Sequence, residues 1–268
     1  MTGVVQARDR SHTVTLPAFL CPAPIADSRP VDPASEAGRY VRTFLIQRMI
    51  IGVLGLTLPA MLVFGDHYVL HGVFPNDPFP RDSESAYYWS GMRDWFVLTV
   101  GTTGFFMIAY KITEKNLDNT ISVIGGLAAI VIPLFPTART GAEVAHGVPE
   151  TPVQKTFGGE KAVQHVHFAA AAVFILALAG VIILFGLRES GRLPHGSRWS
   201  PRFWRDYHFT CAGVVLVAFV WIVVTNHTGK PHWALLAGET ACALAFGASW
   251  FMKGFEIEYV LGRHRGSS

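Results

Sequence analysis

Residues 83–111 read SESAYYWSGMRDWFVLTVGTTGFFMIAYK, in which a polar, aromatic-rich loop runs without a break into a long apolar stretch. Tyr and Trp side chains favour the headgroup region of a bilayer, and an acidic side chain suits the positive end of a helix that begins there. The stretch therefore predicts a boundary between water and membrane near Asp94, with Trp95 among the headgroups and Ser85 in the same polar layer.

The composition of the whole chain agrees with a membrane protein. Of its 268 residues, 50% are hydrophobic and 15% are charged, and the mean hydropathy is +0.33. A soluble domain of this length needs fewer apolar residues for its core, so the excess is expected to face lipid. The basic residues alternate between loops instead of gathering in one patch, and we therefore expect the lipid bilayer, and no nucleic acid, as a partner.

Six apolar stretches predict an all-α, polytopic membrane protein, a bundle of six transmembrane helices. Each stretch approaches the length that crosses about 30 Å of hydrocarbon as a helix, although the third is short for a crossing. The stretches comprise residues 43–65, 95–112, 121–135, 163–187, 209–225 and 233–252. We expect residues 1–38 to form a flexible cytoplasmic tail, residues 39–258 the transmembrane domain, and residues 259–268 a polar C-terminal tail.

The distribution of Lys and Arg predicts the orientation. Fifteen of the 22 basic residues fall on the side that holds both termini, six fall on the opposite side, and Arg48 lies within the first apolar stretch. Because loops rich in Lys and Arg stay in the cytoplasm, both termini are expected to be cytoplasmic. The expected location is the plasma membrane, which in bacteria is the inner membrane.

Polar residues of the predicted outer face suggest a site with metal chemistry. His, Asp and Glu side chains that converge near a membrane surface suit a divalent metal such as zinc, and an open coordination position would activate water for hydrolysis. In this hypothesis Ser85, Asp94 and Glu239 are catalytic, and the metal ligands are His167, His227 and His232. The alternatives are that Asp94 only begins a helix, that Ser85 is an ordinary loop residue and that the histidines bind headgroups or pack in the core.

Glu239 stands out because it lies seven residues beyond His232, inside the last apolar stretch. A carboxylate in hydrocarbon costs several kcal/mol unless it is neutral, paired or facing a wet cavity. We therefore expect Glu239 to point into the bundle, with a partner on the second or fourth predicted helix. It would act as a metal ligand or proton acceptor, or else as a protonated structural residue that bonds across helices.

Several motifs resemble a family of uncharacterised six-span bacterial membrane proteins. They are SxSAYYWxxMRDWFV, the run LDNTISVIGGLAAIVIPLFPT and the run VHFAAAAVFILAL, which together lie within residues 44–188. The resemblance implies the six-helix architecture. A second resemblance, to the alkaline ceramidase-like membrane hydrolases, implies a zinc site, but Trp89 stands where that pattern has a ligand and the later His pairs are two and five residues apart instead of four.

The sequence thus predicts a membrane protein with an outer polar pocket that binds, or as an enzyme hydrolyses, a lipid or other amphiphile. One alternative is a non-catalytic structural or partner-binding subunit. Another is a haem carrier that uses His167 and His227 as axial ligands, or a transporter.

Overall fold

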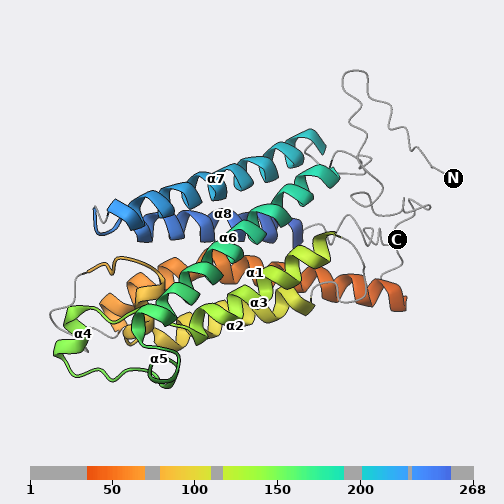
Figure 1. Ribbon diagram of the computed structural model, residues 1–268. Coiled ribbons are helices and arrows are strands. Elements are labelled where there is room, and N and C mark those ends of the chain that lie inside the picture. The colour runs from red at the N-terminus through yellow and green to blue at the C-terminus, as the bar shows by residue number, and fades with distance from the viewer. Residues whose placement is uncertain (1–34, 70–78, 110–116, 190–200, 229–230, 255–268) are drawn as a thin grey trace.

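Among the described residues, six long helices build the bundle, and Figure 1 shows their arrangement in the computed structural model. The structure describes residues 35–69, 79–109, 117–189, 201–228 and 231–254, and in these ranges every regular element is a helix. The long helices are α1 (Glu36–Phe64), α2 (Arg93–Ala109), α3 (Leu117–Leu134), α6 (Glu160–Glu189), α7 (Pro201–Thr228) and α8 (Ala234–Gly254). The predicted all-α polytopic bundle is confirmed. The two predicted tails lie outside the described residues, except that α1 already begins at Glu36.

The lengths of these helices agree with membrane crossings. Within the described residues, five of the six are long and apolar enough to span a bilayer, and α2, with 17 residues, is the shortest of the set. The stretch 121–135 looked short because its helix begins earlier, at Leu117, where a polar turn precedes the apolar residues. The protein is therefore embedded in a membrane through an α-helical bundle.

The long helices form a closed ring in chain order. Each packs mainly against its neighbours in the sequence, and α8 closes the ring by packing along α1. Because the connections join adjacent antiparallel helices, the beginning of α1 and the end of α8 lie at one end of the bundle (Figure 1). The opposite end, here called the cap end, carries the short helices.

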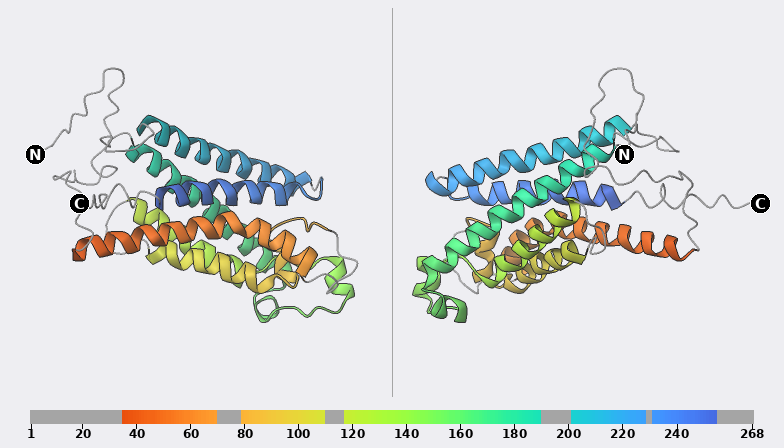
Figure 2. Two further views of the ribbon diagram at one scale, coloured as in Figure 1. Left: turned by 180° about the vertical axis from the view of Figure 1, so that it is seen from behind. Right: turned by 45° about the vertical axis from the view of Figure 1, so that its right-hand side comes forward.

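Four short helices occupy the cap end, and both views of Figure 2 place α4 and α5 there. The π-helical turn η1 (Gly65–Val69) extends α1, and the 3₁₀ helix η2 (Ser85–Trp89) precedes α2. Helices α4 (Gly141–Ala145) and α5 (Pro152–Thr156) lie within residues 137–162, which the sequence indicated only as a polar loop. Both begin with a capping box, in which an N-terminal Thr and a residue three positions later bond each other's backbone.

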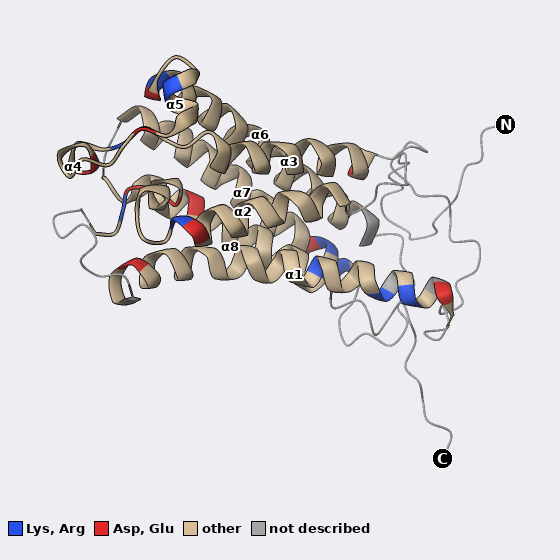
Figure 3. Ribbon diagram, turned by 90° about the horizontal axis from the view of Figure 1, so that it is seen from below, with Lys and Arg blue, Asp and Glu red and all other residues tan. Residues whose placement is uncertain are grey.

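Two apolar clusters fill the bundle. One lies around Phe185, Trp250 and Phe246, and the other, nearer the cap, includes Tyr87, Trp89 and Phe96. Outside the core, large apolar side chains remain exposed along α2 and α7, as expected for surfaces that face lipid. The most exposed examples are Leu98, Phe105, Val217 and Val220. Figure 3 shows that most charged residues of the described chain lie towards the two ends of the bundle.

Glycine permits the close contact between α1 and α8. A Cβ atom on Gly247 would lie 2.6 Å from the backbone nitrogen of Leu56 and 2.8 Å from the carbonyl oxygen of Gly52. Small residues bring helix backbones together in membranes, where packing replaces the hydrophobic effect between helices. The close contact brings α8 against α1, the helix that η1 extends into the cap.

Candidate functional site

Glu239 has a polar partner, as we expected for a carboxyl group inside an apolar helix. It lies two turns into α8, partly buried, and its Oε2 accepts a 2.5 Å hydrogen bond from the backbone N–H of Glu84. The Ser85 backbone also bonds this carboxyl group. The predicted polar contact is therefore confirmed, but its expected source was wrong. The loop before η2 supplies the partner, because this segment folds back over the end of α8 instead of leaving the bundle.

Glu84 is the residue of this contact that the sequence did not single out. Its side chain is buried, with 7% exposed, and Oε1 accepts a 3.3 Å hydrogen bond from the Thr240 hydroxyl. Burial raises the pKa of Glu84 from 4.5 to about 7, although the Thr240 bond opposes the change. Two neighbouring residues of α8 therefore hold both the backbone and the carboxyl group of Glu84.

One further bond joins the same segment to α8, and another joins it to the turn that precedes α8. The backbone N–H of Leu236 donates to the carbonyl oxygen of Asp82 at 2.8 Å. Nε2 of the exposed His232 lies 3.3 Å from the carbonyl oxygen of Pro80. Burial also raises the pKa of the Asp82 carboxyl group. The segment 80–84 is thus tied to the first two turns of α8 by backbone and side-chain bonds together.

A buried ion pair ties the segment to α4. Arg81 is 5% exposed and its Nη1 lies 2.7 Å from Oε1 of Glu143, which is fully buried on α4. Asp66 on η1 lies 3.6 Å from Nε of the same Arg81. Glu143 also accepts the backbone N–H of Thr140 as part of the capping box. Arg81 therefore joins three separate segments of the cap.

The other predicted catalytic residues occupy different environments. Ser85 is buried in η2, with its Oγ 3.3 Å from Oγ of Ser83. Asp94 lies in the first turn of α2, which begins at Arg93 as the sequence predicted, and its side chain is exposed. The structure thus brings Ser85 and Glu239 together and leaves Asp94 on the surface. Their catalytic roles stay a prediction.

The three predicted metal ligands have separate surroundings. His167 is 2% exposed, and its Nδ1 lies 2.8 Å from the carbonyl oxygen of Phe135 and 3.1 Å from that of Ile132. His227, in the last turn of α7, is exposed, and so is His232. Among the described residues, no group of three or more His, Cys, Asp or Glu side chains is arranged to hold a metal ion. Zinc binding and haem ligation stay predictions.

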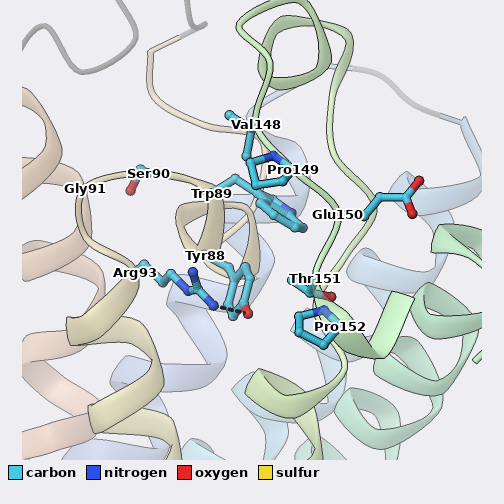
Figure 4. A pocket seen from close by; sticks show the side chains of 10 residues that line it. All are labelled: Tyr88, Trp89, Ser90, Gly91, Arg93, Val148, Pro149, Glu150, Thr151 and Pro152. Carbon is cyan, nitrogen blue, oxygen red and sulfur yellow. Dashed lines mark hydrogen bonds between the residues drawn. The ribbon is translucent and has the colours of Figure 1, made fainter. Parts of the chain in front are cut away.

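The cap end contains a pocket of about 350 Å³ between η2 and residues 148–152. Figure 4 shows the rings of Tyr88 and Trp89 beside Pro149, with Arg93 reaching towards Tyr88. Nη2 of Arg93 donates a 2.6 Å hydrogen bond to the Tyr88 hydroxyl, and its guanidinium lies 4.4 Å from the centre of the same ring. The pocket is lined by Tyr88, Trp89, Ser90, Gly91, Arg93, Val148, Pro149, Glu150, Thr151 and Pro152.

Hydrogen bonds fix both walls of this pocket. Nε1 of Trp89 donates to the carbonyl oxygen of Thr137 at 3.0 Å, which ties η2 to the second loop. On the other side Arg139 binds the carbonyl oxygen of Val148, and its Nε lies 2.6 Å from Oε1 of Glu160. Arg139 also lies 3.3 Å from Oε1 of Glu150, whose carboxylate points away from the aromatic rings (Figure 4). Arg93 therefore supplies a positive charge on the aromatic side of the pocket.

No family model matches the chain, and the comparisons with curated proteins and with solved structures found no match either.

The sequence missed Glu84, Arg81 and Glu143 because their importance depends on contacts between loops. No local spacing relates Arg81 to Glu143, which lies 62 positions later. The sequence led us to expect a pocket between the first loop of the predicted outer face and the outer ends of the second, fourth, fifth and sixth predicted helices. Part of that loop and the start of α2 line the pocket at the cap end, and residues 148–152 form its other wall.

Proposed function

We propose that this membrane-embedded protein binds an anionic amphiphile, such as an anionic lipid, in the pocket between η2 and residues 148–152. The observation that carries the proposal is the combination of aromatic and proline walls with the positive charge of Arg93. Ligand sites typically have apolar walls with a few polar groups that fix orientation. A guanidinium forms strong, often bidentate hydrogen bonds with phosphate and carboxylate groups.

The charge balance of the pocket favours an anion. Glu150 lines it, but its carboxylate is directed towards Arg139. Arg93 is exposed, and its bond to Tyr88 holds the guanidinium at the wall while leaving other N–H groups to donate. Trp95, 49% exposed and two residues further along α2, is of the type that lies at the headgroup level of a bilayer. An amphiphile would thus place its headgroup at Arg93 and its chain along the apolar surface.

We also propose that the pocket faces the outer leaflet of a bacterial inner membrane. The excess of basic residues on the side of the termini supports this orientation. Reporter fusions after residue 268 and within residues 137–162 test it. The first should report the cytoplasm and the second the exterior, and the reverse result would overturn the orientation.

Native mass spectrometry tests the binding proposal. The full chain is placed in nanodiscs that contain equal amounts of phosphatidylglycerol and phosphatidylcholine, and the lipid retained after release is identified. The wild type should retain phosphatidylglycerol. Arg93→Gln should reduce this retention about tenfold, since a hydrogen bond to a charged group contributes roughly 1.5–3 kcal/mol.

Lys155→Gln is the matched control, because it removes the same charge from an exposed position on α5 that does not line the pocket. Its retention of phosphatidylglycerol should equal that of the wild type. Equal losses in both variants would mean that the cap attracts lipid through its overall charge, and the pocket proposal would be abandoned. Retention of phosphatidylcholine alone would contradict the anionic ligand.

Lipid hydrolysis stays a prediction beside this proposal. It rests on the residue types of Ser85, Asp94 and Glu239 and on the hydrolase resemblance. Element analysis of the purified protein, together with a search for released fatty acid, tests it. A metal-free preparation that still retains the amphiphile would separate binding from catalysis.

A further inference from the structure

Two carboxyl groups meet where the first outer loop docks on α8, and the pocket does not use them. Glu239 Oε2 accepts the backbone N–H of Glu84, and the neighbouring Thr240 donates to the Glu84 carboxyl group. The two carboxyl groups also interact electrostatically. Two such groups, one buried and one partly buried, resist simultaneous ionisation because like charges repel strongly where water is scarce.

The two carboxyl groups differ in the hydrogen bonds that they accept, and so in how strongly these bonds favour the ionised form. A backbone N–H can only donate, so the 2.5 Å bond from Glu84 favours an ionised Glu239. The Glu84 carboxyl group has one hydroxyl donor and is buried. The docked arrangement therefore suits a pair in which at least one carboxyl group is neutral, and the buried Glu84 is the group to which we assign the proton.

The positive charge on the segment itself pairs with carboxylates other than Glu84 and Glu239. Arg81 pairs with Glu143 from α4 and with Asp66 from η1. On the segment itself, Asp82 adds a further carboxyl group, whose pKa burial raises. Among the described residues, Tyr87 of η2 and Cys242 of α8 also act on the Glu84–Glu239 pair. Tyr and Cys side chains are both acids that are ordinarily neutral at pH 7. The exposed His232 contacts Pro80 at the edge of the segment.

We propose that Glu84 and Glu239 form a proton-dependent latch, which holds residues 80–84 and η2 against α8 while Glu84 is protonated and loosens when both carboxyl groups are ionised. The raised pKa of Glu84 agrees with this, because it places the loss of the proton near neutral pH. The latch acts on the segment that leads into Tyr88 and Trp89, so it would also move one wall of the pocket.

The direction of the pH effect follows from linkage. The docked Glu84 has a pKa of about 7, whereas a solvated glutamate has the ordinary value of 4.5. The docked state therefore binds the proton more tightly. Docking is strongest below about pH 4.5 and weakens as the pH rises to about 7, by at most about tenfold per pH unit for one proton.

The Leu236 amide reports docking because its N–H donates to Asp82 across the contact. Its hydrogen exchange is measured between pH 5 and 8 in phosphatidylcholine nanodiscs, which lack the proposed anionic ligand, and is divided by the intrinsic rate at each pH. In the wild type the corrected exchange should rise at least tenfold over this range. In Glu84→Gln, which keeps a neutral side chain of the same shape, it should stay constant. An identical profile in the two proteins would overturn the latch.

Glu150→Gln is the control for loss of a carboxylate in the cap, and its profile should match the wild type. Infrared spectroscopy gives a second measurement on the wild type that needs no variant. A protonated carboxyl band should titrate with a midpoint near pH 7, and absence of any such band between pH 5 and 8 would contradict the latch. Neither measurement uses a ligand, so the latch proposal can be contradicted while the amphiphile-binding proposal is supported. The binding proposal can equally be contradicted while the latch proposal is supported.

Discussion

The backbone N–H of Glu84 donates a 2.5 Å hydrogen bond to Oε2 of Glu239 across 155 positions of sequence. The bond joins the segment before η2 to α8. Since α8 packs along α1, and α1 continues into η1 beside Arg81, the contact connects the cap to the seam where the helix ring closes. The cap is therefore fixed on the bundle by specific polar bonds, in addition to the apolar contacts of η2.

Replacing Glu239 tests how much this bond stabilises the fold. In Glu239→Leu the Glu84 N–H loses its acceptor, and an unsatisfied buried donor costs about 1–3 kcal/mol. Glu239→Gln keeps a carbonyl oxygen that can accept the bond, so its cost should be below about 1 kcal/mol. Thermal unfolding in one detergent at pH 6 measures both. A Gln variant as unstable as the Leu variant would show that the charge, and not the acceptor, matters.

Arg81 should be the most sensitive charged residue of the cap. Removing one partner of a buried ion pair leaves an uncompensated charge and typically costs about 3–5 kcal/mol. Arg81→Gln leaves Glu143 fully buried without its 2.7 Å partner, so we expect a loss near the lower end of that range. Lys155→Gln, an exposed charge on α5, should change stability by less than about 0.5 kcal/mol. Equal melting temperatures for the two variants would contradict the role of the pair.

Stability should fall between pH 5 and pH 7 because of Glu84. Its pKa rises on burial from 4.5 to about 7, so the native state holds a proton that the unfolded chain has released. The stabilisation is complete below about pH 4.5 and is lost as the pH passes 7. At about 1.36 kcal/mol per pKa unit this amounts to at most roughly 3 kcal/mol. Melting curves of the wild type and Glu84→Gln should therefore diverge with rising pH, the variant being the less sensitive.

Much of the bundle was predictable because the membrane constrains it locally. An apolar helix must have a minimum length, and this single requirement located all six long helices to within a few residues at most ends. The largest error, at the start of α7, arose because residues 201–208 are polar and aromatic yet helical. Helices continue past the hydrocarbon when their ends can still bond within the helix, and hydropathy does not report this.

The cap was less predictable because its contacts join distant segments. The cost of burying a carboxylate indicated that Glu239 needed a partner, but nothing local identified Glu84 as that partner. Similarly, Trp89 was noted only as an interfacial residue, whereas its indole binds the Thr137 carbonyl and forms one wall of the pocket. The sequence pattern indicated that residues such as Glu239 need polar partners. The path of the folded chain determines which residues become those partners.

Glycine at the contact of α2 with α3 provides the last prediction. A Cβ atom on Gly104 would lie 2.7 Å from the carbonyl oxygen of Gly126, a backbone atom that cannot move without separating the helices. Gly104→Ala should therefore destabilise the bundle by about 1–3 kcal/mol, the usual cost of overpacking. Gly101, one turn earlier on the same helix, has open space where its Cβ would be.

Gly101→Ala is the matched control for this substitution. It should leave stability unchanged or raise it by up to about 1 kcal/mol, because Ala favours helix more than Gly does. Thermal unfolding of the two variants in the same detergent measures the difference. If both variants were equally stable, the α2–α3 contact would have to be looser than the structure places it. If both were equally destabilised, the loss would lie in the helix itself, and the close backbone approach at Gly126 would not explain it.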